Sequence, residues 1–186
     1  DDGAALIFLL RALGERVTAV TTTHGNTSLE NVLHNSRRLL AYLDQPDLPL
    51  GRGAAKGLIE EKAWFASWQA GYGDTPPWPE KTPLPLAANL IIDTVRAHPG
   101  QVTLIAVGPL TNLALAVRLA PDIVPLVRQV VTMGGSLAAK PKPEFNARCD
   151  PEATQIVQNA GWPLRLIGLE ITTQVKFSRA AFAQLP

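Results

Sequence analysis

Apolar, β-branched runs alternate with helical patterns along most of this 186-residue chain. The run VTLIAV at 102–107 is almost wholly apolar, which is typical of a parallel strand covered on both faces. Further strands are predicted at 17–23, 48–50, 127–133 and 163–169. Helices are predicted at 3–13, 28–43, 86–97, 110–119 and 152–159. The alternation predicts an α/β fold, a Rossmann-like and mostly parallel sheet flanked by helices.

Local signals support two of the helix starts. Thr27 and Glu30 have the spacing of a capping box ahead of the helix at 28–43. Asp150 precedes Pro151, as a helix cap precedes a proline at the first helical position. The stretch 59–81 is rich in Trp and Pro, and we expect it to be a partly helical excursion that leads to a loop.

The predicted strands end in glycine and polar residues. These ends read THGN at 23–26, VGP at 107–109, MGG at 133–135 and GLE at 168–170. A tight turn alone can explain one such glycine. Ligands of open parallel sheets bind beyond the carboxyl ends of the strands, so four such ends favour a ligand site at that edge.

Composition narrows the class of protein. Lys and Arg total 17 against 16 Asp and Glu, which gives a formal charge of +1. A charge this close to zero does not indicate binding to nucleic acid or to an anionic membrane. No apolar run is long enough to span a bilayer. The single cysteine, Cys149, excludes an internal disulfide and fits a reducing compartment, so we expect a cytoplasmic location. No base or metal motif adjacent in sequence suggests activation of the Cys149 thiol, and we predict that it is not a nucleophile.

Two polar groups near predicted element ends could carry chemistry. Asp1 and Asp2 are adjacent carboxylates, which are hard oxygen ligands suited to Ca²⁺ or Mg²⁺. They could equally cap the first helix. Asn26 follows His24-Gly25 at a strand end, where its carboxamide could orient a water or a sugar hydroxyl, although Gly-Asn is also an ordinary turn.

A third group follows the MGG strand end. Glu144 and Asn146 are two apart, as an extended segment would place two side chains on one face, and both could bind ribose hydroxyls. The alternative is a solvated loop. A further alternative site is GRGAAKG at 51–57, one residue off the dinucleotide fingerprint, although the strand before it is short and no clear helix follows.

Six segments together, in their order and spacing, resemble the inosine–uridine preferring nucleoside hydrolase family. They are DDGAAL (1–6), TTTHGNTSLENVLHN (21–35), VGPLTNLALA (107–116), VVTMGG (130–135), EFNARCDPEA (144–153) and IGLEIT (167–172). The resemblance implies the nucleoside hydrolase fold. It also implies hydrolysis of the N-glycosidic bond of a ribonucleoside, to ribose and a free base, by a calcium-activated water.

The resemblance also implies roles for individual residues. Asp2 is similar to a bidentate calcium ligand, and Val107 is expected to give its backbone carbonyl to the same Ca²⁺. Asp1 resembles a carboxylate that contacts the ribose 2′-hydroxyl. Asn26 resembles the residue that positions the attacking water. The remaining matches lie around the ribose: Met133, Glu144 and Asn146.

The chain departs from the family in four places. In the family motif D-x-D-x-G-x-D-D the earlier Asp residues, including the general base, come before the two that match Asp1 and Asp2, and this sequence does not contain them; it also lacks the family's C-terminal His-Asp pair. The loop SLAAKPKP at 136–143 lacks the usual Gly-Asn, and the loop at 67–73 lacks a histidine. We therefore treat 1–186 as a single partial domain, and expect these residues alone not to hydrolyse nucleosides at an enzyme's rate.

Two rival hypotheses remain open. One is a truncated, catalytically inactive remnant, or a nucleoside- or ribose-binding module, of the same fold. The other is a generic nucleotide-binding α/β domain. As partners we expect a ribonucleoside substrate and, for the intact protein, further copies of the chain, but neither nucleic acid nor membrane.

Overall fold

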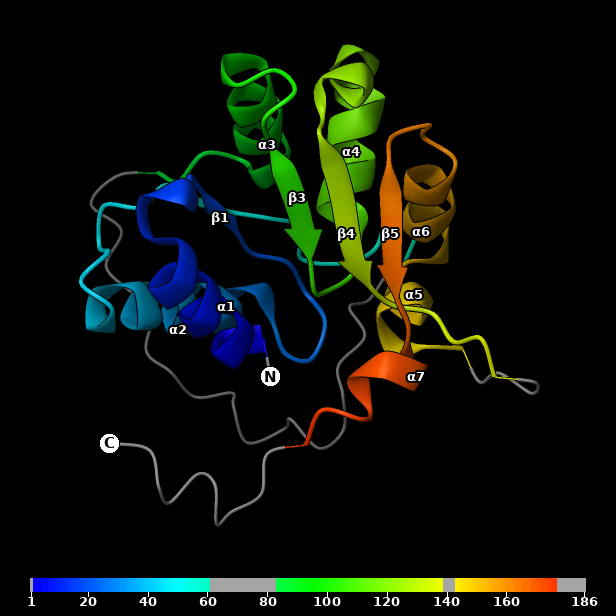
Figure 1. Ribbon diagram of the computed structural model, residues 1–186, viewed down its shortest axis with the longest axis horizontal. Coiled ribbons are helices and arrows are strands. Elements are labelled where there is room, and N and C mark those ends of the chain that lie inside the picture. Colours follow the sequence, from blue (N-terminus) through cyan, green and yellow to red (C-terminus); the bar gives the residue numbers. More distant parts are fainter. Residues whose placement is uncertain (1, 61–82, 139–142, 177–186) are drawn as a thin grey trace.

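The computed structural model describes residues 2–60, 83–138 and 143–176. Within these residues the strands form two parallel sheets (Figure 1). One sheet pairs β1 (Val20–Thr21) with β2 (Leu50–Gly51). The other has the order β3 (Thr103–Ala106), β4 (Gln129–Met133) and β5 (Leu164–Ile167). The predicted parallel α/β architecture is confirmed, with the strands shared between two sheets.

Helices alternate with these strands. The longer ones are α1 (Asp2–Leu13), α2 (Leu29–Tyr42), α3 (Ala87–Ala97), α4 (Thr111–Leu119) and α6 (Pro151–Gln158). The short ones are α5 (Phe145–Cys149), α7 (Leu169–Thr172) and the 3₁₀ turns η1 (Gly14–Arg16) and η3 (Pro121–Leu126). None of the described helices is long and apolar enough to cross a membrane.

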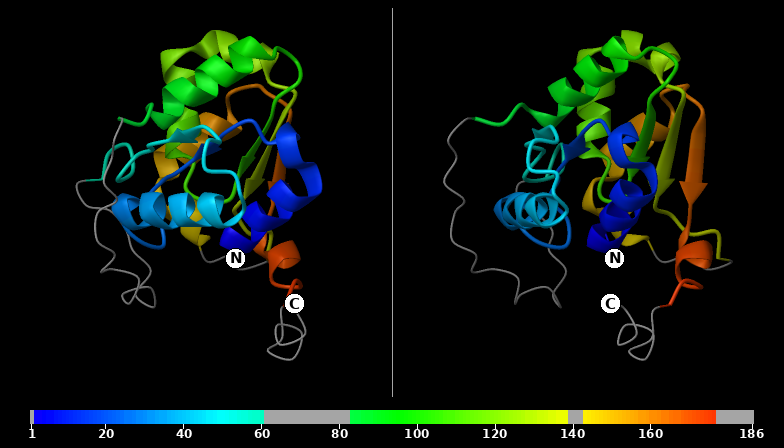
Figure 2. Two further views of the ribbon diagram at one scale, coloured as in Figure 1. Left: turned by 90° about the vertical axis from the view of Figure 1, so that its left-hand side faces the viewer. Right: turned by 60° about the vertical axis from the view of Figure 1, so that its left-hand side comes forward.

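Helices α3, α4 and α6 cover one face of the β3–β4–β5 sheet (Figure 2). Val130 and Thr132 of β4 point to this face and are buried, as the alternation of side chains along a strand requires. Ile105 and Leu166 remain 47% and 41% exposed. The expectation that 102–107 is covered on both faces is therefore not met within the described residues.

A second, smaller core lies between α1, α2 and β2. It is built from leucines, namely Leu10, Leu29, Leu33, Leu40, Leu43 and Leu50. The side chain of Asn112 connects α4 to the segments after β1 and β2: Nδ2 donates to the Thr22 carbonyl at 2.8 Å, and Oδ1 accepts from the Ala54 amide at 2.9 Å. Residues that follow β1 and β2 are thereby held against the first turn of α4.

Two local predictions were wrong in detail, and two short helices were missed. The strand predicted at 17–23 is only two residues long, because it pairs with the equally short β2. Ser28, not Thr27, caps α2 by accepting from the Asn31 amide, since the helix begins one residue later than the capping box predicts. Helices α5 and α7 were not predicted, because elements this short show no periodicity. The excursion expected at 59–81 lies almost wholly outside the described residues.

Candidate functional site

The carboxyl ends of β3, β4 and β5 lie at one end of the molecule, and the N-terminal end of α1 lies at the same end in all views (Figures 1 and 2). Segments that follow β3 and β4 meet α5 there. A small hollow of about 10 Å³ lies beside them, and Met133, Gly134 and Asn146 are among its lining residues. The structure thus brings together three of the residues proposed from the sequence: Val107, Met133 and Asn146.

Asn146 connects these three residues through its side chain. Its Nδ2 donates to the Val107 carbonyl at 3.0 Å and to the Met133 carbonyl at 3.2 Å, and it lies 3.3 Å from Met133 Sδ. Carbonyl oxygens only accept, so only the NH₂ side of the amide can face them. Among the described residues Oδ1 has no hydrogen-bond partner, and this atom of a half-buried side chain can accept from a ligand hydroxyl.

Glu144 is buried but is used mainly as a helix cap. Its carboxylate accepts from the backbone amides of Asn146 (3.0 Å) and Ala147 (3.1 Å), and from that of Gly135 at 3.3 Å. Glu144 and Asn146 therefore do not lie in one extended segment, as the sequence reading assumed, because the chain turns into α5 directly after Glu144. The carboxylate still connects the loop after β4 to the helix that bears Asn146.

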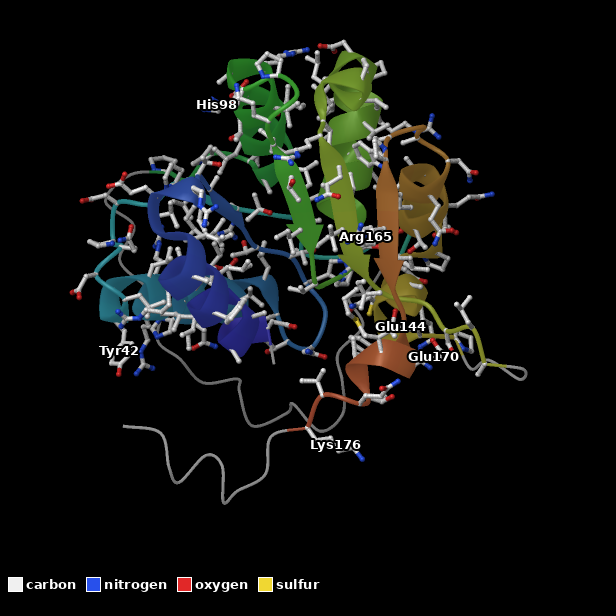
Figure 3. The ribbon with its side chains drawn as sticks, viewed as in Figure 1. Tyr42, His98, Glu144, Arg165, Glu170 and Lys176 are labelled. Carbon is white, nitrogen blue, oxygen red and sulfur yellow. The ribbon has the colours of Figure 1, made fainter. Side chains whose placement is uncertain are left out.

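Glu170, which the sequence reading did not single out, holds the same loop from the other side. Its Oε1 accepts from the Ser136 hydroxyl at 2.6 Å and from the Leu137 amide at 2.8 Å. The hydrogen bond from Ser136 is the largest influence that lowers the pKa of Glu170. Figure 3 labels Glu144 and Glu170 near the ends of β4 and β5, and both carboxylates accept from backbone amides of the loop after β4. Only its position after a strand end could have indicated this role.

The described oxygen donors suit calcium in type but not in number. Asp2 is an exposed residue at the start of α1, although protein atoms around its carboxyl raise the pKa of that group. The Val107 carbonyl keeps a second lone pair beside its bond from Asn146. Calcium takes six to eight oxygen ligands. Within the described ranges no group of three or more His, Cys, Asp or Glu side chains could hold a metal ion, and Asp1 lies outside them.

Asn26 lies half-buried in the segment after β1. The residues before it are tightly packed: a Cβ added to Gly25 would lie 3.2 Å from Pro109 Cδ, and one added to Gly108 would lie 3.1 Å from Thr23 Cγ2. The segment that carries Asn26 therefore packs on the segment that follows Val107. The expected contacts of the loop at 67–73 lie outside the described residues.

The glycines at 51–57 are explained by packing rather than by phosphate binding. A Cβ on Gly53 would lie 1.6 Å from the Thr22 carbonyl oxygen, and one on Gly57 would lie 3.0 Å from the Cys149 carbonyl oxygen. No helix follows Gly53 in the described residues up to 60, whereas a dinucleotide fingerprint opens a helix. The alternative of a dinucleotide-binding loop at 51–57 is therefore wrong, because the helix that such a loop opens does not follow it in the part of the chain that the structure describes.

The chain also resembles known proteins over its length. It matches the family model of the inosine-uridine preferring nucleoside hydrolases over residues 1–186. An inosine-uridine preferring nucleoside hydrolase of Leishmania major is 40% identical over 183 residues, covering 93% of this chain and 58% of the relative. Uridine nucleosidase 1 of Arabidopsis thaliana is 33% identical over 187 residues, covering 96% and 56%. A solved plant nucleoside hydrolase superposes with a TM-score of 0.80 at 29% identity, covering 95% of this chain and 59% of that one.

The parallel sheets and the polar residues beyond their strands define a Rossmann-like α/β protein with a candidate ligand site at the carboxyl edge. The chain belongs to the inosine–uridine preferring nucleoside hydrolase family. It spans 56% to 58% of the length of the two curated relatives.

Proposed function

We propose that the protein hydrolyses the N-glycosidic bond of ribonucleosides, releasing ribose and a free base. Asn146 is the observation that carries this proposal. Its amide is fixed by two backbone carbonyls, so Oδ1 is oriented before any ligand arrives. An acceptor held in this way can strengthen its hydrogen bond to a sugar hydroxyl as the transition state forms, without reorganising.

Two of the other proposed ribose contacts, Met133 and Glu144, contact Asn146. Met133 lines the same hollow and contacts the Asn146 amide through its sulfur and its carbonyl. Glu144 has room for about one more donor, since a carboxylate has about four lone-pair sites and three amides occupy this one. We assign Asp1 to the ribose 2′-hydroxyl and Asn26 to the attacking water.

We propose Ca²⁺ as the cofactor, held by Asp2 and the Val107 carbonyl together with ligands outside the described residues. When bound, it lowers the pKa of a water molecule that attacks the sugar. Support comes from the chemistry of the donors, which are hard oxygens. Two donors among the described residues are fewer than the six to eight oxygen ligands that calcium takes, so the proposed site needs further ligands.

The names of the relatives support a nucleoside substrate without defining the base. One relative is named for inosine and uridine, the other for uridine alone. The described residues around Asn146 are assigned to the sugar, and none of them is assigned to the base. The cytoplasmic location and the homo-oligomer stay predictions.

Ribose release tests this function. The product of the complete gene is incubated with inosine and with uridine, in the presence of calcium and then of a chelator. The proposal predicts release of ribose and base from at least one nucleoside, and loss of that release with the chelator. Tight binding of ribose without turnover in calcium would support the binding-module alternative and contradict hydrolysis.

A further inference from the structure

A buried chain of polar side chains lies behind the candidate site. His24 Nε2 is 3.2 Å from Thr111 Oγ1, and Thr111 Oγ1 is 2.6 Å from Asp150 Oδ2. All three residues are at most 1% exposed. They come from the segment after β1, the first residue of α4 and the cap of α6, so the chain of hydrogen bonds crosses three parts of the fold.

The direction of each hydrogen bond follows from its partners. Asp150 also accepts from the amides of Leu58 and Ala153, both at 3.0 Å, and an ionised carboxylate only accepts. Thr111 therefore donates its one proton to Asp150. His24 must then donate from Nε2 to Thr111, which assigns the proton of the neutral imidazole to Nε2.

This arrangement leaves one buried atom without a partner. Nδ1 of His24 is a bare acceptor, and no described group donates to it. A buried unsatisfied polar atom costs about 1–3 kcal/mol, and an apolar side chain of similar shape would avoid that cost. Stability alone is therefore a poor explanation for a histidine at this position.

Each residue of this hydrogen-bonded chain lies within four residues in sequence of a proposed site residue. His24 is joined through Gly25 to Asn26, and Thr111 follows the segment that begins at Val107. Asp150 directly follows α5, the helix that carries Asn146. The network therefore connects the segments that carry the proposed water contact, calcium contact and ribose contact.

We propose that His24, Thr111 and Asp150 form a chain of hydrogen bonds with fixed donors, here called the relay, and that this relay positions Asn26 against the segments of Val107 and Asn146. The Thr111 hydroxyl is the central positioning group of the relay. The proposal rests on the proposed function for its catalytic consequence. Thr111 acts through His24 and Gly25, and it does not itself touch the substrate.

Two substitutions of Thr111 distinguish the effect of its hydroxyl from the effect of its side-chain volume. Thr111→Val keeps the shape and removes the hydroxyl, whereas Thr111→Ser keeps the hydroxyl. Thr94→Val is a matched control, because the Thr94 hydroxyl donates only to the Leu90 carbonyl within α3. In the product of the complete gene, Thr111→Val should lower kcat by roughly tenfold to a hundredfold with a smaller change in KM, as expected for a misplaced group. Thr111→Ser and Thr94→Val should stay near the parent protein.

Nitrogen NMR tests the relay even if no hydrolysis is found. In the parent protein the His24 ring should be neutral, with a protonated Nε2 and a bare Nδ1. The side-chain amide signals of Asn26 should move in Thr111→Val and remain in place in Thr94→Val. A proton on Nδ1, or unmoved Asn26 signals in folded Thr111→Val, would overturn the proposal. If Thr111→Val does not fold, the tautomer in the parent protein and the Asn26 signals of Thr111→Ser decide: a proton on Nδ1 or shifted Asn26 signals would count against the relay.

Discussion

Asn146 donates a hydrogen bond of 3.0 Å from its side chain to the backbone carbonyl of Val107. One residue is the proposed ribose contact and the other the proposed calcium contact, so the two functions meet in a single bond. A change at Asn146 is therefore expected to disturb both the sugar and the metal.

Substitution of Asn146 should lower activity strongly. In the product of the complete gene, Asn146→Ala removes both the fixed acceptor and the bond to Val107, and kcat/KM should fall by about tenfold to a thousandfold. Asn159→Ala is the matched control, because the side chain of Asn159 lies at an exposed helix end and, among the described residues, donates only to the Gln155 carbonyl. Steady-state kinetics of both variants check this, and equal values for the two variants would count against the ribose role.

Gly53 should tolerate no side chain. A Cβ would lie 1.6 Å from the Thr22 carbonyl oxygen, so Gly53→Ala must move backbone and should destabilise the protein by about 3 kcal/mol or more. Gly3→Ala is the control, since its Cβ would meet only Leu39 at 3.9 Å and alanine favours a helix. Urea unfolding measures both changes. A Gly53→Ala protein as stable as its parent would show that the two sheets are not held together as described.

His24 should make stability depend on pH. Burial lowers its pKa below 6.5, and the nearby Asp150 carboxylate opposes this shift by a smaller amount. Below pH 6.5 His24 binds a proton in the unfolded chain but stays neutral in the folded protein. The free energy of unfolding therefore falls as the pH drops towards the pKa of His24 in the folded protein. His24→Gln can still donate to Thr111 but does not titrate. Its free energy of unfolding should fall less between pH 6.5 and about pH 5, and an identical fall in both proteins would contradict the assignment.

Cys149 should be chemically inert in the folded protein. Burial raises the pKa of its thiol to about 11, with smaller opposing and supporting effects from Arg148, Glu144 and Asp150. Roughly one thiol in a thousand is then ionised at about pH 8. Reaction with a thiol reagent should be slow until the protein is unfolded, and Cys149→Ala should retain hydrolysis. Rapid labelling of the native protein, with matching loss of activity, would point instead to a functional thiol.

The long elements could be predicted from the sequence because their signals are local. The apolar run at 102–107, the α4 pattern and the Asp150 cap each depend on neighbouring residues, and all three were confirmed within a residue or two. The short helix α5 could not be predicted. As a result, Glu144 was expected to extend toward a sugar, whereas it caps the helix that bears Asn146.

From the sequence, only the part of the candidate site that lies at strand ends could be predicted. Val107 and Met133 end predicted strands, and their meeting at Asn146 follows from a parallel sheet. The bond between His24 and Thr111 joins residues far apart in sequence, and no local pattern indicates it. The reason for Gly53 is equally non-local, because its neighbour is the backbone of Thr22, directly after β1.

A crystal structure of the product of the complete gene with calcium and ribose tests the central claim most directly. The account predicts a ribose hydroxyl within hydrogen-bond distance of Asn146 Oδ1. It also predicts calcium on the Asp2 carboxylate and the Val107 carbonyl oxygen. Ribose bound elsewhere, or calcium bound away from Val107, would contradict the assignment of this edge of the sheet as the nucleoside site.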